Sequence, residues 1–473
     1  MSEGSLRRSY DISGTPGPTP FAFARHANTS PGESFLQCWR YCILMRSPSS
    51  NAAESREITS GSNDTVPESQ PLSSRPRRSA RYDDAFLDEM RTRGDAPADR
   101  VIESLLTHHE LGTARRLLTT LIENDGPLPE SLPPEVLEYL RASEHLEGSE
   151  RAAIEEGQRL FAEHGLLVLM CLACYSLPAA YAAAKGVKVL HRTAYLEKRP
   201  AKRLFETTQM VVDVMTPGGL ERGGRGVRTA QKVRLMHAMV RHMIQSDANW
   251  SADLGVPINQ EDLAGTLMTF SWITLDGLDK LGVHLTPEAR ESYLAAWRAV
   301  GRLMGVDEEL LPETVADAAV LTQRIQARQI GGSEEGRLMT EALLEMMKRN
   351  SGGGLLGNIP AALMRHFLPA QVADFLGIPN KGWAHWVVRI AVALGAQIEH
   401  FAERWSLLES LARYFSIHFI QWMITVDLNG RRAAFEIPDV LARRWHLDPD
   451  TEPTFFERLE RWARRVAYSV KGP

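Results

Sequence analysis

One predicted helix places a cation and a hydroxyl on the same face. Arg203 and Thr207 are four residues apart, so on a helix they point the same way, in line with Met210 and Val214. This arrangement presents charge and a hydrogen-bond donor on an apolar stripe. Arg203 and Glu206 also have the spacing of an ordinary ion pair on a helix surface. The spacing alone leaves both interpretations open.

A second predicted helix carries His237 on its apolar face. The histidine shares that face with Val233, Val240 and Ile244, so we expect its imidazole to point into the core. A buried neutral imidazole is the proximal ligand that a haem iron requires. A single inward histidine is more often a hydrogen-bonded core residue. Periodicity does not decide between a haem ligand and a core residue.

Strong signals bound the two helices and the loop between them. Pro200 occupies the first turn of the first helix, and Pro217 follows its end. The connection GGLERGGRG is rich in glycine, but it follows a helix and not a strand. We therefore interpret it as a flexible connection and not as a phosphate-binding loop.

The remainder of the chain after Asp83 also has helical periodicity, with hardly any alternation of the kind that indicates strands. Asn259, followed by Asp262, resembles a capped helix start, and Thr286 before Pro287 opens another helix in the same way. The sequence predicts an all-α fold. The expected helices include 261–281, 313–329, 335–349, 360–376, 383–426 and 454–469, and 431–438 is expected to be a loop or a small hairpin.

The chain divides into two parts by composition. Residues 1–82 are rich in Ser, Pro, Gly and Arg, which bury too little apolar surface to offset the entropy of the chain. We expect a disordered leader there, followed by one helical domain over 83–473. Gly165–Ala184 is uncharged and long enough to span a membrane, but its Ala content favours a buried core helix. Cys171 and Cys174 lie within this stretch, where buried packing is expected rather than redox chemistry.

Composition and missing motifs exclude several classes of function. The net charge of −5 gives no general attraction to phosphate backbones, so nucleic acid is not an expected partner. None of the fourteen histidines has the Glu-x-x-His spacing of a ferritin-like di-iron site. Zinc-protease, nucleophile-elbow and phosphate-loop signatures are missing too. With four cysteines and no convincing secretion signal, we expect a cytoplasmic protein, with membrane association as the alternative.

Four segments resemble the rubber oxygenase and ER-bound oxygenase family, which includes latex-clearing proteins and a fungal oxygenase of mycophenolic acid biosynthesis. The segments are RLFET, VMTPGGLERGGRGVRTAQKVRLMHAMVRH, GVPINQEDLAGTL and FLGIPNKGW, and the similarity extends from about residue 150 to about residue 430. This resemblance implies an all-helical protein with a globin-like core that binds haem b. It also implies cleavage of carbon–carbon double bonds of isoprenoid chains with dioxygen.

The same resemblance implies roles for individual residues. His237 would be the proximal iron ligand, with Arg203 and Thr207 at the haem and His242 as a supporting residue. One position departs from the pattern, because latex-clearing proteins typically have lysine where this chain has Glu206. A carboxylate there would act as a base or would pair with Arg203, and pairing is favoured because an ionised group is seldom left alone in a pocket.

This departure puts polyisoprene in doubt as the substrate, so we expect a small apolar alkene with an isoprenoid-like chain. Two alternatives belong to other classes of protein, namely a haem-binding sensor or carrier without enzyme activity and a haem-free structural protein. The sequence does not indicate the oligomeric state.

Overall fold

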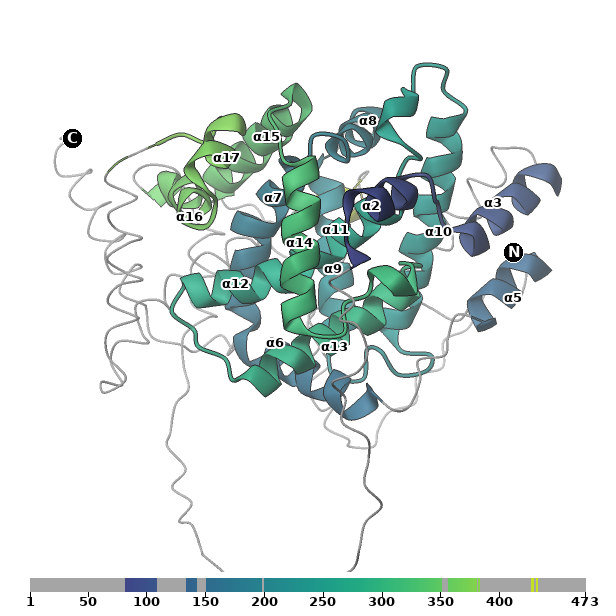
Figure 1. Cartoon of the computed structure of the whole chain (residues 1–473), viewed down its shortest axis with the longest axis horizontal. Coiled ribbons are helices and arrows are strands. Elements are labelled where there is room, and N and C mark those ends of the chain that lie inside the picture. The colour runs from purple at the N-terminus through teal and green to yellow at the C-terminus, as the bar shows by residue number, and fades with distance from the viewer. Residues whose placement is uncertain are drawn as a thin grey trace, which may run out of the picture.

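The protein is described here from a computed structural model. The described residues are 81–108, 133–142, 150–197, 200–350, 356–380, 382, 427–428 and 431–432. The predicted leader, except for its last two residues, and the predicted helices 383–426 and 454–469 lie outside them. Within this part of the chain nearly every element is a helix, so the predicted all-α fold is confirmed (Figure 1).

The helices, in chain order, are α2 Asp84–Arg91, α3 Ala96–His108, α5 Pro134–Ala142, α6 Arg151–Cys171, the π-helical turn Leu172–Ser176, α7 Leu177–Tyr181, α8 Val187–Glu197, α9 Pro200–Met215, α10 Arg225–Gln245, α11 Gln260–Phe270, α12 Trp272–Lys280, α13 Pro287–Leu303, α14 Val315–Gln329, α15 Glu334–Asn350, α16 Ile359–Phe367 and α17 Ala370–Phe375, with short 3₁₀ turns at Ala252–Leu254, Glu308–Leu310 and Leu356–Asn358. Two short antiparallel strands, β1 Asp427–Leu428 and β2 Arg431–Arg432, form a hairpin that includes the start of the expected loop or hairpin at 431–438.

The main core surrounds α6, which packs along the length of α13 and also contacts α9 and α12. Helix α10 packs against α9 on one side and against α3 on the other. In Figure 1, α3 and α5 lie at one edge of the molecule beyond α10, and α15, α16 and α17 lie at the opposite edge. A second, smaller hydrophobic cluster joins α3, α5 and the outer side of α10. Helix α10 is therefore buried on two opposite faces.

The apolar stretch Gly165–Ala184 forms the end of α6, the π-helical turn and α7, and its last three residues follow α7 as a turn. Arg151–Tyr181 is long and apolar enough to cross a membrane, but 78% of its most apolar window is buried inside the fold, which agrees with the predicted core helix. Cys171 and Cys174 are fully buried and form no disulfide, and burial raises the pKa of both thiols. The π-helical turn precedes Pro178, which cannot donate a backbone hydrogen bond within a regular helix.

Two predicted helices are each divided into two, and both predictions of a continuous helix were wrong. The stretch 261–281 breaks at Ser271, whose hydroxyl donates to the carbonyl of Leu267 at 2.9 Å and so competes with the backbone ladder. The stretch 360–376 breaks at Leu368, which is extended because it precedes Pro369.

The predicted helix starts at Asn259 and Thr286 are confirmed. Asn259 caps α11 by accepting a hydrogen bond from the backbone N–H of Asp262 at 3.0 Å. Thr286 caps α13 through the backbone N–H of Ala289 at 3.2 Å. Asp83 caps α2 in the same way, and Tyr82 just before it is buried.

Candidate functional site

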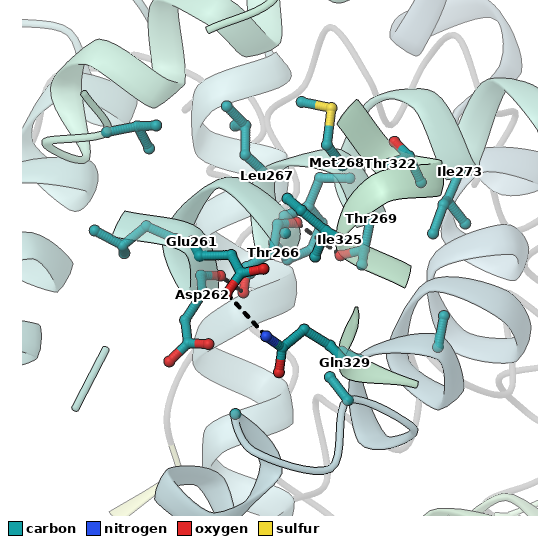
Figure 2. A pocket seen from close by; sticks show the side chains of 18 of the residues that line it. Glu261, Asp262, Thr266, Leu267, Met268, Thr269, Ile273, Thr322, Ile325 and Gln329 are labelled. Atoms are coloured by element: carbon teal, nitrogen blue, oxygen red, sulfur yellow. Dashed lines mark hydrogen bonds between the residues drawn. The ribbon is translucent and has the colours of Figure 1, made fainter. Parts of the chain in front are cut away.

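An apolar cavity of about 190 Å³ lies among α7, α9, α10, α11, α13 and α14 (Figure 2). Helices α11 and α14 supply a large part of its wall, because each turns one face of small and apolar side chains inward. Apolar lining residues include Leu263, Leu267, Met268, Phe270, Ile273 and Ile325. The cavity therefore suits a flat or elongated apolar molecule.

His237 is the residue of α10 that lines the cavity, and Met210 of α9 lines it as well. The structure thus places His237, which is half-buried, on the wall of an apolar space, and its role as an iron ligand stays a prediction. The predicted apolar stripe of α9 is also present, since Met210, Val211 and Val214 are buried. Among the predicted site residues whose side chains are described, His237 alone lies on the cavity wall.

The other predicted site residues lie away from the cavity or beyond description. Glu206 and Thr207 are half-buried on α9, one turn before Met210, and do not line the cavity. His242 is half-buried in the last turn of α10 and does not line it either. The side chain of Arg203 lies outside the described part of the structure, so its predicted pairing with Glu206 remains a prediction.

Two arginines, the buried Arg241 and the half-buried Arg234, hold α10 to its neighbours on the side near His237. Arg234 donates two hydrogen bonds to Asp95, at 2.6 and 2.8 Å. Arg241 donates to the carbonyl of Pro257 at 3.1 Å and to that of Ile258 at 3.0 Å. These contacts fix the rotation of α10 about its axis, and with it the direction of the histidine.

Ile258 lies on the cavity wall in a strained backbone conformation. Its φ of 52° is the only positive value found for a non-glycine residue in the described part of the chain. A β-branched residue rarely adopts this conformation, which is sustained only where neighbouring contacts fix it. The Arg241 guanidinium provides such a contact, and the strain keeps the isoleucine side chain against the cavity.

An acidic pair on the first turn of α11 forms a polar wall of the same cavity. Glu261 is fully buried and accepts hydrogen bonds from Arg91 at 3.0 Å, Arg328 at 2.9 Å and Gln329 at 2.8 Å. Its charge is therefore matched by two guanidinium groups from α2 and α14. Asp262 accepts one hydrogen bond from Arg91 at 3.1 Å, and 17% of the surface of its side chain is exposed. Burial raises the pKa of Asp262 to about 6, although Arg91 acts to lower it.

Sequence reasoning missed Glu261, Asp262 and Gln329 as site residues. The acidic pair follows Asn259 at the start of an apolar helix, which helix capping and the helix dipole already explain. The pair of adjacent carboxylates was the one further signal of a site, because the capping of the helix start accounts for only one of them. Gln329 ends α14 without any local feature that indicates a site.

The residues at the cavity fit a haem group. Haem requires an apolar slot and one imidazole that reaches the iron, and His237 on the apolar wall provides both. Among the described residues, no group of three or more His, Cys, Asp or Glu side chains is arranged to hold a bare metal ion. A single histidine against an apolar wall is compatible with a porphyrin-bound iron, which needs one protein ligand.

Comparison with known proteins identifies the family. Residues 158–397 match the model of the family described as ER-bound oxygenase mpaB/B'/Rubber oxygenase, catalytic domain. The chain is 25% identical over 361 residues to the rubber oxygenase of Streptomyces sp. (strain K30), covering 73% of this chain and 86% of that protein.

A solved structure of latex clearing protein LCP in the closed state superimposes with a TM-score of 0.60. It covers 74% of this chain and 95% of its own, at 22% identity. At that identity the superposition shows a shared helical fold. Because the family model covers half of the chain and includes both α9 and α10, the protein belongs to the ER-bound oxygenase mpaB/B' and rubber oxygenase family.

Proposed function

We propose that the protein is a haem b-dependent oxygenase that uses dioxygen to cleave or oxygenate a carbon–carbon double bond of a small, apolar, isoprenoid-like molecule. The observation that carries this proposal is His237 on the wall of an apolar cavity in a chain of an oxygenase family. The Streptomyces relative is named a rubber oxygenase, which supports an apolar alkene as the class of substrate.

In this proposal His237 would hold the iron, and Arg234 and Arg241 keep its helix from rotating. The haem iron, when bound, supplies the activation of dioxygen. Arg203 and Thr207 would supply a positive charge and a hydroxyl donor to the haem from beside the cavity, because Thr207 lies one turn before Met210 and does not line the cavity itself. Glu206 would pair with Arg203. His242 would support α10 from its last turn. The apolar wall would exclude water and orient the alkene.

The absorption spectrum of the purified chain tests the haem assignment. We expect a Soret band in the wild type that is lost in His237→Ala and kept in His284→Ala, a matched change at an exposed histidine. A full Soret band in His237→Ala would contradict the assignment.

Product analysis tests the enzyme assignment. We expect oxygen-dependent carbonyl products from short isoprenoid alkenes and little product from polyisoprene. Haem binding with no product from any alkene would instead indicate a haem carrier or sensor. A cytoplasmic location, expected from the sequence, remains a prediction that cell fractionation can test.

A further inference from the structure

We propose that Asp262 and Gln329 form an acceptor site in the cavity that recognises a hydrogen-bond donor on the substrate, so that the preferred substrate is an apolar alkene bearing a hydroxyl group and not a plain hydrocarbon or an anion. This inference rests on the proposed function, whose substrate class it specifies.

Gln329 provides an unmatched acceptor. Its side chain is buried, with 4% of the residue exposed, and its Nε2 donates to Glu261 at 2.8 Å. An ionised carboxylate only accepts hydrogen bonds, so this contact fixes which end of the amide is nitrogen. The amide oxygen Oε1 then has no hydrogen-bond partner among the described residues. In Figure 2 this oxygen points away from Glu261. A buried acceptor without a donor is costly, which makes a donor from a bound molecule favourable.

Asp262 provides a second acceptor on the same wall. Arg91 donates to its Oδ1 at 3.1 Å and Asn259 donates to its Oδ2 at 3.0 Å, which leaves each oxygen able to accept another hydrogen bond. Gly186 also lines the cavity, and a Cβ there would lie 3.5 Å from Oδ1. Glycine therefore leaves this side of the carboxyl uncovered.

The nearby arginines do not turn this wall into a site for anions. Arg91 and Arg328 do not line the cavity. Arg328 and the Nη1 atom of Arg91 are engaged by Glu261, Asp262 and the aspartates of α2, and only the Nε of Arg91 has no hydrogen-bond partner among the described residues. The charged residues that line this wall are thus the carboxylates Glu261 and Asp262, and beside them the amide oxygen of Gln329 has no donor in the described part of the chain. They attract an O–H donor and repel a carboxylate or phosphate. Figure 2 shows the three polar side chains together, away from the apolar Met268 and Ile273.

Binding measurements on the full chain as purified test the proposal without relying on turnover. The probes are farnesol, farnesyl methyl ether and farnesoic acid, which share one isoprenoid chain and differ in the donor. We expect farnesol to bind about tenfold more tightly than the ether, as one hydrogen bond to a charged or buried acceptor implies, and the acid to bind more weakly than the ether. Equal affinities for alcohol and ether, or no measurable binding of the alcohol, would overturn the proposal.

Two cavity variants test whether Asp262 and Gln329 cause the preference for the alcohol over the ether. Asp262→Ala and Gln329→Met should each reduce the alcohol-to-ether ratio toward one, with little change in affinity for the ether. Asp317→Asn changes a buried aspartate of α14 that does not line the cavity, and it should keep the full ratio. If one cavity variant fails to fold, the other still decides the outcome. An unchanged alcohol-to-ether affinity ratio in a cavity variant that folds would overturn the proposal.

The same samples separate this inference from the proposed function, because their absorption spectra report haem independently. A preference for the alcohol in a chain without a Soret band would support the acceptor site and contradict the haem assignment. A Soret band in a chain that does not prefer the alcohol would support the haem assignment and contradict the acceptor site.

Discussion

Thr229 of α10 donates a hydrogen bond to the buried carboxylate of Asp213 on α9, with 2.8 Å between the two oxygens. Gln209 donates to the same carboxylate at 2.8 Å, and Arg225 forms an ion pair with it at 3.1 Å. One buried carboxylate thus joins the helix of the predicted residues Arg203, Glu206 and Thr207 to the helix of His237. The relative position of these two helices depends on it.

Replacing Asp213 by Ala should lower the free energy of unfolding by about 2 to 3 kcal/mol, because it removes several contacts and leaves Arg225 without this buried partner. Thr229→Val removes a single hydrogen bond and should cost about 1 kcal/mol. Urea unfolding of both variants measures the difference. Equal costs for the two variants would show that Asp213 is not the centre of this contact. The Soret absorbance per chain should fall in Asp213→Ala in parallel, since the histidine helix is displaced.

Local patterns predicted the helices and His237 but not the acidic wall of the cavity. The caps at Asn259 and Thr286 are read from three or four neighbouring residues, and the inward face of His237 is read from one helix. Glu261 depends on partners far away in the chain, since Arg91 is 170 positions before it and Gln329 is 68 positions after it. The spacing of residues within one helix gives no information about contacts between residues so far apart in the chain.

The broken helices show a second limit. The sequence around Ser271 retains helical periodicity, and the break depends on buried polar contacts such as the hydroxyl of Ser176, which donates to the carbonyl of Thr269 at 2.6 Å from another helix. The break at Pro369 was readable from the sequence, because the residue before proline disfavours the helical region.

Glu206→Gln distinguishes the two roles considered for this carboxylate. Glu206 is half-buried and does not line the cavity, so we expect it to act as a charge partner and not as a base. The substitution should change the free energy of unfolding by about 0.5 kcal/mol and the turnover rate by less than about threefold. Rates with a short isoprenoid alkene, measured beside urea unfolding, provide the test. A loss of more than about a hundredfold in rate with unchanged stability would instead indicate a base.

Substitutions at Gly277 and Cys171 should have coupled effects on the free energy of unfolding. A Cβ at Gly277 would lie 2.9 Å from the sulfur of Cys171, which is fully buried. Gly277→Ala should therefore destabilise the fold by about 1 to 3 kcal/mol, although alanine favours a helix. Cys171→Ala removes the sulfur, so the double variant should be more stable than the sum of the two single changes predicts, by about 1 kcal/mol.

Urea unfolding of the wild type, both single variants and the double variant gives this coupling. Gly331→Ala is the control, because its Cβ would meet only Ala184 at 3.7 Å, and it should change stability by about 0.5 kcal/mol or less. Strictly additive effects would contradict the close contact in the core.

Asp262 should make the stability of the fold depend on pH with a defined sign. Its pKa is about 6 in the folded protein, against 3.8 for an aspartate that is exposed to water. The folded state therefore binds the proton more tightly than the unfolded state does. The stabilisation is complete below the lower pKa and is lost as the pH rises through the higher one, so the charged carboxyl costs about 2 to 3 kcal/mol above pH 7.

Asp262→Asn carries no titrating group, so the comparison with the wild type isolates this effect. The free energy of unfolding of the wild type minus that of the variant should fall by about 2 to 3 kcal/mol between about pH 4 and pH 7.5. Leu263→Ala is the matched control at the next residue, and its cost should be the same at both pH values because leucine does not titrate. If the difference for Asp262→Asn is constant, or rises with pH, the carboxyl is not held by burial in the way that its position on the cavity wall requires.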